Sequence, residues 1–261
     1  MSRVWTIAKR EYLSYFKAPM GWILIAIYTA VSGFYYSLML QMNYVDTSAI
    51  LNFMRGLFFV LIPIMTMRTF SAEIKSGTDI LYRTSPASSM QIVLGKYISS
   101  VLLFLTMSAA NVIYILTTIA FDGIIDLKYW GTLIAFLLTA LVYIAIGIFA
   151  SALTSNQIVA AIISFVVFIV FELFNSISSM LGNGLTSLIN NLDFNDNISA
   201  AREASIGQGL TNFLDWLNPA SKLTGFYEGT FDLVAIVYFI SVIAIFTYIT
   251  AQIVESSRWK K

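Results

Sequence analysis

Six long apolar segments, separated by polar stretches, constrain this chain more than any other feature of its sequence. A helix needs about 20 predominantly apolar residues to cross the hydrocarbon core of a bilayer. The segments are residues 19–41, 50–67, 97–121, 130–153, 157–177 and 231–254. Charged residues make up only 11% of the chain, whereas about 25% is usual in a soluble domain. We therefore predict an all-α integral membrane protein with six transmembrane helices.

The basic residues between these segments predict the orientation of the chain. Most of them lie before the first segment, between the second and third, or after the sixth. They are Arg3, Lys9, Arg10, Lys17, Arg68, Lys75, Arg83, Lys96, Arg258, Lys260 and Lys261. If every segment crosses the membrane, these three regions share one side, which the positive-inside rule assigns to the cytoplasm. We expect both termini to be cytoplasmic and the membrane to be a bacterial plasma membrane.

The residue types that the chain lacks exclude several classes of protein. There is no cysteine and no histidine, which removes disulfides, thiolate chemistry, the commonest general base and the commonest metal ligand. The apolar segments contain no cluster of carboxylates. We therefore expect no catalytic residue, no metal and no cofactor in this chain, and we disfavour an intramembrane enzyme. We also expect membrane lipids, and no nucleic acid, among its partners.

Two segments outside the apolar stretches are predicted to lie on the membrane surface. In residues 1–18, apolar side chains such as Trp5 and Tyr12 share one helical face, and Arg3 and Arg10 lie on the opposite face. This interfacial helix either anchors the chain to anionic lipid or, as an elbow helix, also contributes to a docking site for an ATPase. Residues 178–230 are rich in Asn, Gly and Ser and are predicted to form an extracellular cap of short helices.

The loop at residues 68–96 has the signals of short helices between the second and third spans. Ser71 is predicted to cap a helical turn that Gly77 ends in a left-handed conformation. Thr78 is predicted to begin a second short helix, which Pro86 ends. The alternative is an ordinary solvated loop with salt bridges.

This loop resembles that of the ABC-2-type permease family. The family has a Glu, a Ser-Gly-Thr step, a Leu, a Pro and a Gly-Lys pair, which fall here on Glu73, Ser76, Gly77, Thr78, Leu81, Pro86, Gly95 and Lys96. The resemblance extends to Pro63, Asn218-Pro219 and the Phe-Asp-Leu step at 231–233, so it covers essentially the whole chain. Asp79 departs from the apolar residue that is usual in the family. The chain is most similar to permeases related to gliding motility and nitrous-oxide-reductase maturation.

The resemblance implies a six-span permease domain over residues 19–261 that works with a separate ATPase. The coupling helix that would sit in a cleft of the ATPase comprises Glu73, Ser76, Gly77, Thr78, Asp79, Leu81 and Pro86. The sequence has no GxxxxGK[ST] phosphate-binding loop, so ATP and Mg²⁺ are expected in the ATPase subunit. A second copy of the chain, or a homologous permease, completes the expected exporter. Its spans favour an amphiphilic substrate such as a peptide or a lipid-linked molecule.

Polar and small residues within the spans give two further hypotheses. Arg55 and Glu172 are expected at a similar depth, where they either form an ion pair in a polar pathway or reach the outer headgroup layer separately. Four small residues of the first span, Ala26, Ala30, Gly33 and Ser37, form one stripe. The stripe either forms a seam between two copies or packs against another helix of the same protomer.

Two other functions remain open at this point. The alternative to an exporter is an ATP-independent channel or secondary transporter, which often has inverted repeats and intramembrane charges. The chain has no evident repeat and one acidic residue well inside a span. Within the exporter class, the sequence does not separate substrate export from the transmission of mechanical force to a partner protein.

Overall fold

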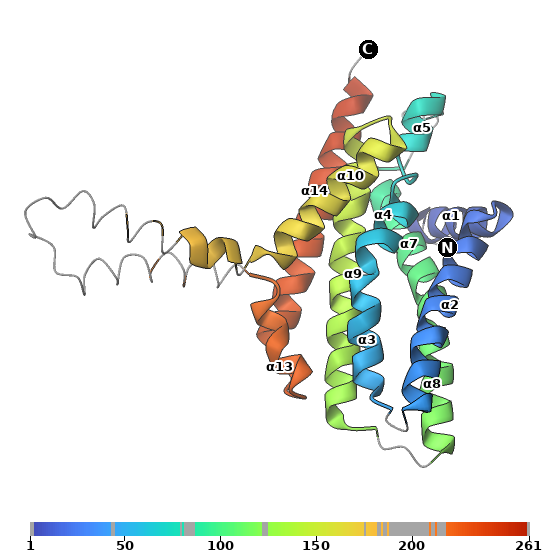
Figure 1. Ribbon diagram of the computed structural model, residues 1–261. Helices are drawn as coiled ribbons and strands as arrows, with labels where there is room; N and C mark the ends of the chain where they lie inside the picture. Colours follow the sequence, from blue (N-terminus) through green and yellow to red (C-terminus); the bar gives the residue numbers. More distant parts are fainter. Residues whose placement is uncertain are drawn as a thin grey trace, which may run out of the picture.

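The computed structural model describes residues 3–42, 45–78, 80, 87–121, 125–174, 176–181, 184, 187, 209, 212 and 218–259. Within these ranges every regular element is a helix (Figure 1). The longer helices are α2 (Met20–Gln41), α7 (Ser89–Ser108), α9 (Leu127–Leu153), α10 (Gln157–Glu172) and α14 (Leu233–Trp259). The shorter ones are α1 (Arg3–Lys17), α3 (Thr47–Gly56), α4 (Phe58–Thr66), α5 (Ser71–Ser76), α8 (Ala110–Ala120) and α13 (Thr224–Tyr227), preceded by a 3-10 turn (Ser221–Leu223).

Four of the predicted spans are confirmed as helices long and apolar enough to cross a membrane. They are Met20–Gln41, Ser89–Ala120, Leu127–Leu153 and Leu233–Ser257, which correspond to the first, third, fourth and sixth apolar segments. The third of the six predicted spans comprises α7 and α8 in succession. These four helices identify the chain as an integral membrane protein.

The second and fifth predicted spans differ from straight transmembrane helices. In the second, α3 and α4 meet at a bend of 55°, directly after Gly56, a residue of low helix propensity. In the fifth, α10 has 16 residues, or about 24 Å at 1.5 Å per residue, against a hydrocarbon core of about 30 Å. The count of six spans therefore stays a prediction, as does the cap over 178–230, most of which lies outside the described residues.

Helix α9 is the centre around which the other helices pack. It contacts α3, α4, α7, α10, α13 and α14, and 67% of its most apolar stretch is buried, against 22% in α2 and α14. Two glycines allow this close packing, because a Cβ at Gly131 or Gly147 would overlap the Phe226 carbonyl or the Thr66 side chain. Glycines of the fourth span thus serve packing within the protomer.

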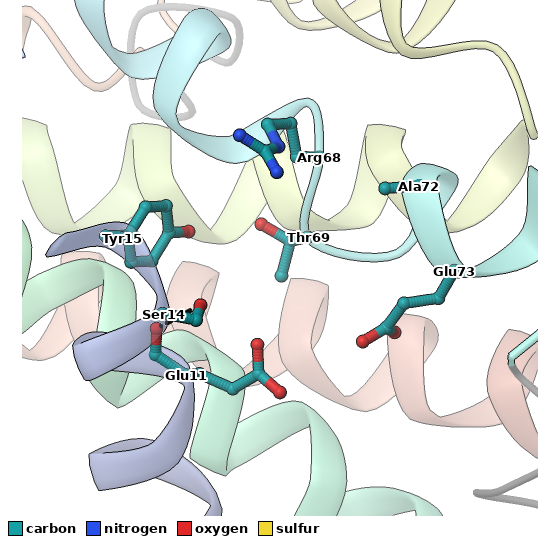
Figure 2. A pocket seen from close by; sticks show the side chains of 7 residues that line it. All are labelled: Glu11, Ser14, Tyr15, Arg68, Thr69, Ala72 and Glu73. Atoms are coloured by element: carbon teal, nitrogen blue, oxygen red, sulfur yellow. Dashed lines mark hydrogen bonds between the residues drawn. The ribbon is translucent and has the colours of Figure 1, made fainter. Parts of the chain in front are cut away.

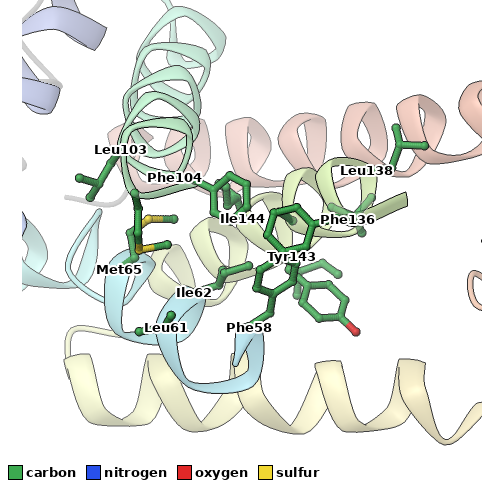
Figure 3. Packing of buried hydrophobic residues seen from close by; sticks show 14 of the residues in the cluster. Phe58, Leu61, Ile62, Met65, Leu103, Phe104, Phe136, Leu138, Tyr143 and Ile144 are labelled. Carbon is green, nitrogen blue, oxygen red and sulfur yellow. The ribbon is translucent and has the colours of Figure 1, made fainter. Parts of the chain in front are cut away.

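Aromatic rings fill the core where α4, α7 and α9 meet (Figure 3). The ring centroid of Phe58 lies 4.8 Å from that of Phe136 and 5.5 Å from that of Phe104. Tyr143 of α9 stacks on Phe168 of α10 at 4.0 Å. Because Phe58 is the first residue of α4, this cluster holds the chain just after the bend of the second span.

Helix α2 packs through one polar face and leaves its stripe of small residues outside. Tyr28 accepts a hydrogen bond from Asn111 at 2.9 Å, and the Ser32 and Tyr114 hydroxyls lie 2.8 Å apart. The predicted stripe lies on another face: Ala26, Ala30 and Ser37 are exposed, whereas Gly33 is half-buried beside Tyr114. Packing within the protomer is therefore limited to Gly33, and a seam between copies stays a prediction.

Helix α1 forms the helix predicted within residues 1–18, and its axis crosses the upper end of α2 (Figure 1). It packs chiefly against α7 and also against α2. Ala8 is fully buried, and Trp5 and Leu13 are exposed. Pro19 caps the start of α2, with a φ of −67° that suits a helix beginning.

Candidate functional site

Helix α5, the first part of the predicted coupling element, is held at its first turn by Ser151 of α9. The first amides of a helix have no partner within the helix. The Ser151 hydroxyl accepts hydrogen bonds from the Phe70 amide at 2.9 Å and the Ser71 amide at 3.1 Å, and it donates to the Met67 carbonyl at 3.0 Å. The prediction that Ser71 caps this helix is wrong, because Ser71 is the first helical residue and its hydroxyl donates to the Met67 carbonyl.

The other end of α5 stops at Gly77, as predicted. Gly77 has a φ of 69°, a left-handed conformation that glycine adopts without strain. The amides of Gly77 and Thr78 donate to the carbonyls of Ile74 and Glu73 at 3.4 and 3.1 Å, and the Ser76 and Thr78 hydroxyls lie 2.9 Å apart. Residues 74–78 are all exposed. Helix α5 is thus fixed at its base and exposed at its tip.

Three other residues of the predicted coupling element lie outside the described residues. They are Asp79, Leu81 and Pro86. The predicted second short helix therefore stays a prediction. The description resumes at residue 87, and Ser88 then caps α7 through a reciprocal pair of hydrogen bonds with Gln91.

Lys96 of α7 lies beneath the base of α5 and is only 1% exposed. Its ammonium donates to the Glu73 carboxylate at 2.8 Å and to the Thr69 carbonyl at 2.7 Å. It also lies 4.9 Å from the ring centroid of Phe70. A buried charge is tolerated only when it is paired and hydrogen-bonded. Lys96 therefore ties α7 to the segment that leads into α5.

Helix α1 reaches the same ammonium through Glu11. One Glu11 oxygen lies 3.8 Å from Lys96 Nζ, and the other accepts a hydrogen bond from Arg10 at 3.2 Å. Gly95 permits this approach, because a Cβ there would lie 2.7 Å from Ile7 Cγ2. We call Lys96, Glu73 and Glu11 the lysine junction; it joins α1, α5 and α7 at one charge.

A cavity of about 190 Å³ opens beside the lysine junction (Figure 2). Its walls come from α1, the α4–α5 connection and α5, and are formed by Glu11, Ser14, Tyr15, Arg68, Thr69, Ala72 and Glu73. Figure 2 shows the Arg68 guanidinium on one side, the carboxylates of Glu11 and Glu73 on the other, and Thr69 between them. Burial raises the pKa of the Tyr15 hydroxyl above its ordinary value, so this group is a neutral donor, and it donates to the Met65 carbonyl at 3.3 Å.

A second polar cluster lies at the bend of the second span. Arg55 stands in the last turn of α3, and its guanidinium donates to Glu172 at 3.2 Å and to the Tyr227 hydroxyl. The side chains of Arg55 and Glu172 are 26% and 44% exposed. The two predicted residues are thus brought together, with a third partner from α13. We call Arg55, Glu172 and Tyr227 the arginine cluster.

Three residues that make these contacts, Glu11, Ser151 and Tyr227, were not predicted as site residues from the sequence. Glu11 carried a usable signal, because it is the sole acidic residue among the basic residues of 1–18. In the sequence, Ser151 is one of many small residues in an apolar span and Tyr227 is one aromatic residue in a long loop, so neither stands out as a site residue. Lys96 was predicted only as a cytoplasmic basic residue and as part of the family motif, without a partner.

Comparison with known protein families gives one finding that spans these elements. The family described as ABC-2 family transporter protein matches residues 5–249, from the first turn of α1 into the middle of α14. The match identifies the family but not the subgroup of permeases related to gliding motility and nitrous-oxide-reductase maturation, so that subgroup stays a prediction. A search among curated proteins finds no match for the chain.

Proposed function

The chain belongs to the ABC-2 transporter family, and on that premise we propose that it is the permease subunit of an ATP-driven exporter. ATP and Mg²⁺ bind a separate ATPase subunit, and a second copy of the chain or a homologous permease completes the transporter. The substrate is an amphiphile, a peptide or a lipid-linked molecule, that leaves the cytoplasm or the inner leaflet. The weakly charged, aromatic spans support that choice of substrate.

The observation that carries this proposal is the contrast between the two ends of α5. Its base is fixed by Ser151 and Lys96, whereas residues 74–78 at its tip are exposed. An exposed tip on a fixed base suits an element that a partner pushes. The exposed Ile74 adds an apolar contact to this tip, of the kind that a cleft in an ATPase would cover.

The lysine junction supports a path for that push into the membrane domain. A displacement of α5 moves Glu73, which holds Lys96 of α7, and Lys96 in turn lies beside Glu11 of α1. The start of α7 is also tied to α14, because the Ser89 hydroxyl donates to Glu255. Movement of α5 therefore reaches three other helices through charged and hydrogen-bonded contacts.

We assign the arginine cluster to the translocation pathway. Its charges meet where α3 and α4 break, and broken helices with charges are typical of regions that line a polar cavity within a membrane. The ion pair is half-exposed, so it can separate without leaving a deeply buried charge.

The first test is affinity purification of the chain from its native membranes, with identification of the proteins that co-purify. We expect a stoichiometric ATPase subunit that carries a phosphate-binding loop. Gly77→Ala and Gly56→Ala form a matched pair, because a Cβ meets nothing within 4 Å at either position but only Gly77 has a positive φ. The Gly77 variant should lose the ATPase several-fold, since an alanine is strained by about 1–2 kcal/mol in that conformation, and the Gly56 variant should not.

The outcomes test separately whether α5 is the coupling contact and whether the chain belongs to an exporter. If the two glycine variants retain the ATPase equally, the tip of α5 is not the coupling contact, although the chain remains a permease. If the wild-type chain purifies intact without any ATPase, the exporter proposal is wrong. The ATP-independent channel or secondary transporter then gains support from the break between α3 and α4.

A further inference from the structure

The cavity beside the lysine junction separates positive from negative charge. Arg68 stands on one wall, and among the described residues no carboxylate lies within 4.0 Å of its guanidinium. Its one hydrogen-bond contact there is with Met20 Sδ at 3.4 Å. The carboxylates of Glu11 and Glu73 form the opposite wall. A ligand that matches both walls carries an anionic group and a cationic group a short distance apart.

Thr69 lies between these walls and provides a second, independent sign of a ligand. Thr69 is 8% exposed. Among the described residues, no donor or acceptor lies at hydrogen-bonding distance and angle from its buried hydroxyl. Together with the Ser100 hydroxyl, it lies near enough to Tyr15 to oppose the rise that burial causes in the pKa of Tyr15. The Tyr15 hydroxyl is thus the neighbour of the Thr69 hydroxyl, and a phosphate oxygen in the cavity would be a stronger, charged acceptor for it.

The cavity lies where the chain enters the membrane. Arg68 contacts the first residue of α2, and the neighbouring Trp22 is 61% exposed, with its indole nitrogen donating to the Phe16 carbonyl at 3.2 Å. Exposed tryptophans with a bonded N–H are typical of the interface between lipid and water. Helix α1, which forms one wall, is the amphipathic helix with exposed Trp5 and Leu13. The mouth of the cavity therefore lies at the depth of lipid headgroups.

We propose that this cavity binds the headgroup of a phospholipid that carries a phosphate and a primary ammonium, as phosphatidylethanolamine does. The phosphate lies against Arg68 and the Thr69 hydroxyl, and the ammonium donates to Glu11. A volume of about 190 Å³ suits a headgroup, since sites for whole drug-sized ligands measure about 300–1,000 Å³. Lys96 and Arg10 neutralise part of the charge of Glu11 and Glu73, so a purely anionic headgroup is the competitor that the test has to include. A quaternary ammonium has no N–H to donate to Glu11.

The bound lipid would join α1 to the α4–α5 connection beside the lysine junction. The proposal does not depend on the exporter function, because it concerns the cavity alone. It goes beyond a general attraction of basic residues to the membrane, since it names one cavity and one headgroup class.

The test measures which lipids the full-length chain retains. The chain is placed in nanodiscs with equal amounts of phosphatidylethanolamine, phosphatidylcholine and phosphatidylglycerol, released into mild detergent, and weighed with its bound lipids by native mass spectrometry. We expect wild type to retain phosphatidylethanolamine over both others. Arg68→Gln should lower that retention about tenfold, the change that follows from losing a charge-assisted hydrogen bond, and Arg68→Lys should retain most of it.

Two further variants test which residues contact the headgroup. Glu11→Gln should remove the preference for phosphatidylethanolamine over phosphatidylcholine, because the preference rests on the ammonium N–H. Arg3→Gln, on the same helix but not lining the cavity, should change nothing. Each variant is first checked for a single elution peak and a wild-type thermal transition. If Arg68→Gln does not fold, Glu11→Gln still tests the proposal through the preference for phosphatidylethanolamine over phosphatidylcholine.

Three results would overturn the proposal. Wild type could retain the three lipids equally, or Arg3→Gln could lower retention as much as Arg68→Gln, which would mean unspecific attraction to the surface. Alternatively, Arg68→Gln and Glu11→Gln could release a co-purifying protein while lipid retention stays unchanged. In that case the cavity receives a side chain of a protein partner and not a lipid.

Discussion

The lysine junction and the arginine cluster are both built from a base, a carboxylate and a further polar group, yet their surroundings differ. Lys96 is 1% exposed and bonded to a backbone carbonyl and to Glu73, whose side chain is 21% exposed. Arg55 and Glu172 are 26% and 44% exposed, and each lies at the end of its helix. Removing one partner of a buried pair strands a charge in a low dielectric. In the polar pathway proposed for the second cluster, water can take the place of a lost partner. We therefore expect the first cluster to stay closed and the second to separate more readily.

The difference fits the roles proposed for the two regions. A joint that transmits force from α5 to α1 and α7 has to stay closed throughout a transport cycle. A pair beside a helix break in the pathway has to separate at some stage. Substitutions that probe stability at the two places should therefore give effects of different size.

The largest effect is expected from removing the charge at the lysine junction. Lys96→Met should destabilise the protein by about 2–3 kcal/mol, because Glu73 is then left without its ammonium; the cost stays below that of a fully buried pair since the Glu73 side chain is 21% exposed. Denaturation in mixed micelles measures this loss, with the exposed Lys75→Met as the control. Adding Glu73→Leu to Lys96→Met should recover part of the stability, since the stranded carboxylate is gone. If Lys96→Met unfolds like Lys75→Met, the junction is no more than a surface contact.

A smaller effect is expected when the base of α5 loses its cap but keeps its charges. Ser151→Ala removes the acceptor for two backbone amides and should destabilise by about 1–2 kcal/mol. Hydrogen exchange should accelerate at the amides of Phe70 and Ser71 and stay unchanged in the middle of α9. Ser241→Ala is the control, because the Ser241 hydroxyl donates only to a carbonyl of its own helix, α14. Unchanged exchange at Phe70 and Ser71 would mean that Ser151 does not hold α5.

The smallest effect is expected at the arginine cluster. Arg55→Glu and Glu172→Arg should each destabilise by about 0.2–1 kcal/mol, the range of half-exposed ion pairs. The double exchange should be better tolerated than either single change, in unfolding and in cell growth that depends on the protein. If the double exchange behaves no better than the single changes, the ion pair contributes nothing and the contrast between the two clusters fails.

Local chemistry in the sequence was enough to predict most of the elements. Apolar length predicts four spans that the fold confirms, and Gly77 ends α5 with a positive φ as its residue type predicts. The depth of Arg55 and Glu172 in the membrane follows from the rise of a helix per residue, so the sequence allowed the hypothesis that they form a pair. Hydropathy, however, does not distinguish a straight span from the bent pair α3 and α4, because a 55° bend leaves the composition unchanged.

The sequence by itself therefore determined that the chain is a helical membrane protein, that α5 ends at Gly77 and which residues are able to carry charge. Only the tertiary structure decided which of these residues meet. Ser151 caps a helix that begins 80 residues earlier in the chain, and Lys96 bonds a carboxylate 23 residues before it. Periodicity specifies which face of a helix a residue occupies, whereas these contacts depend on how faces from distant helices pack around α9.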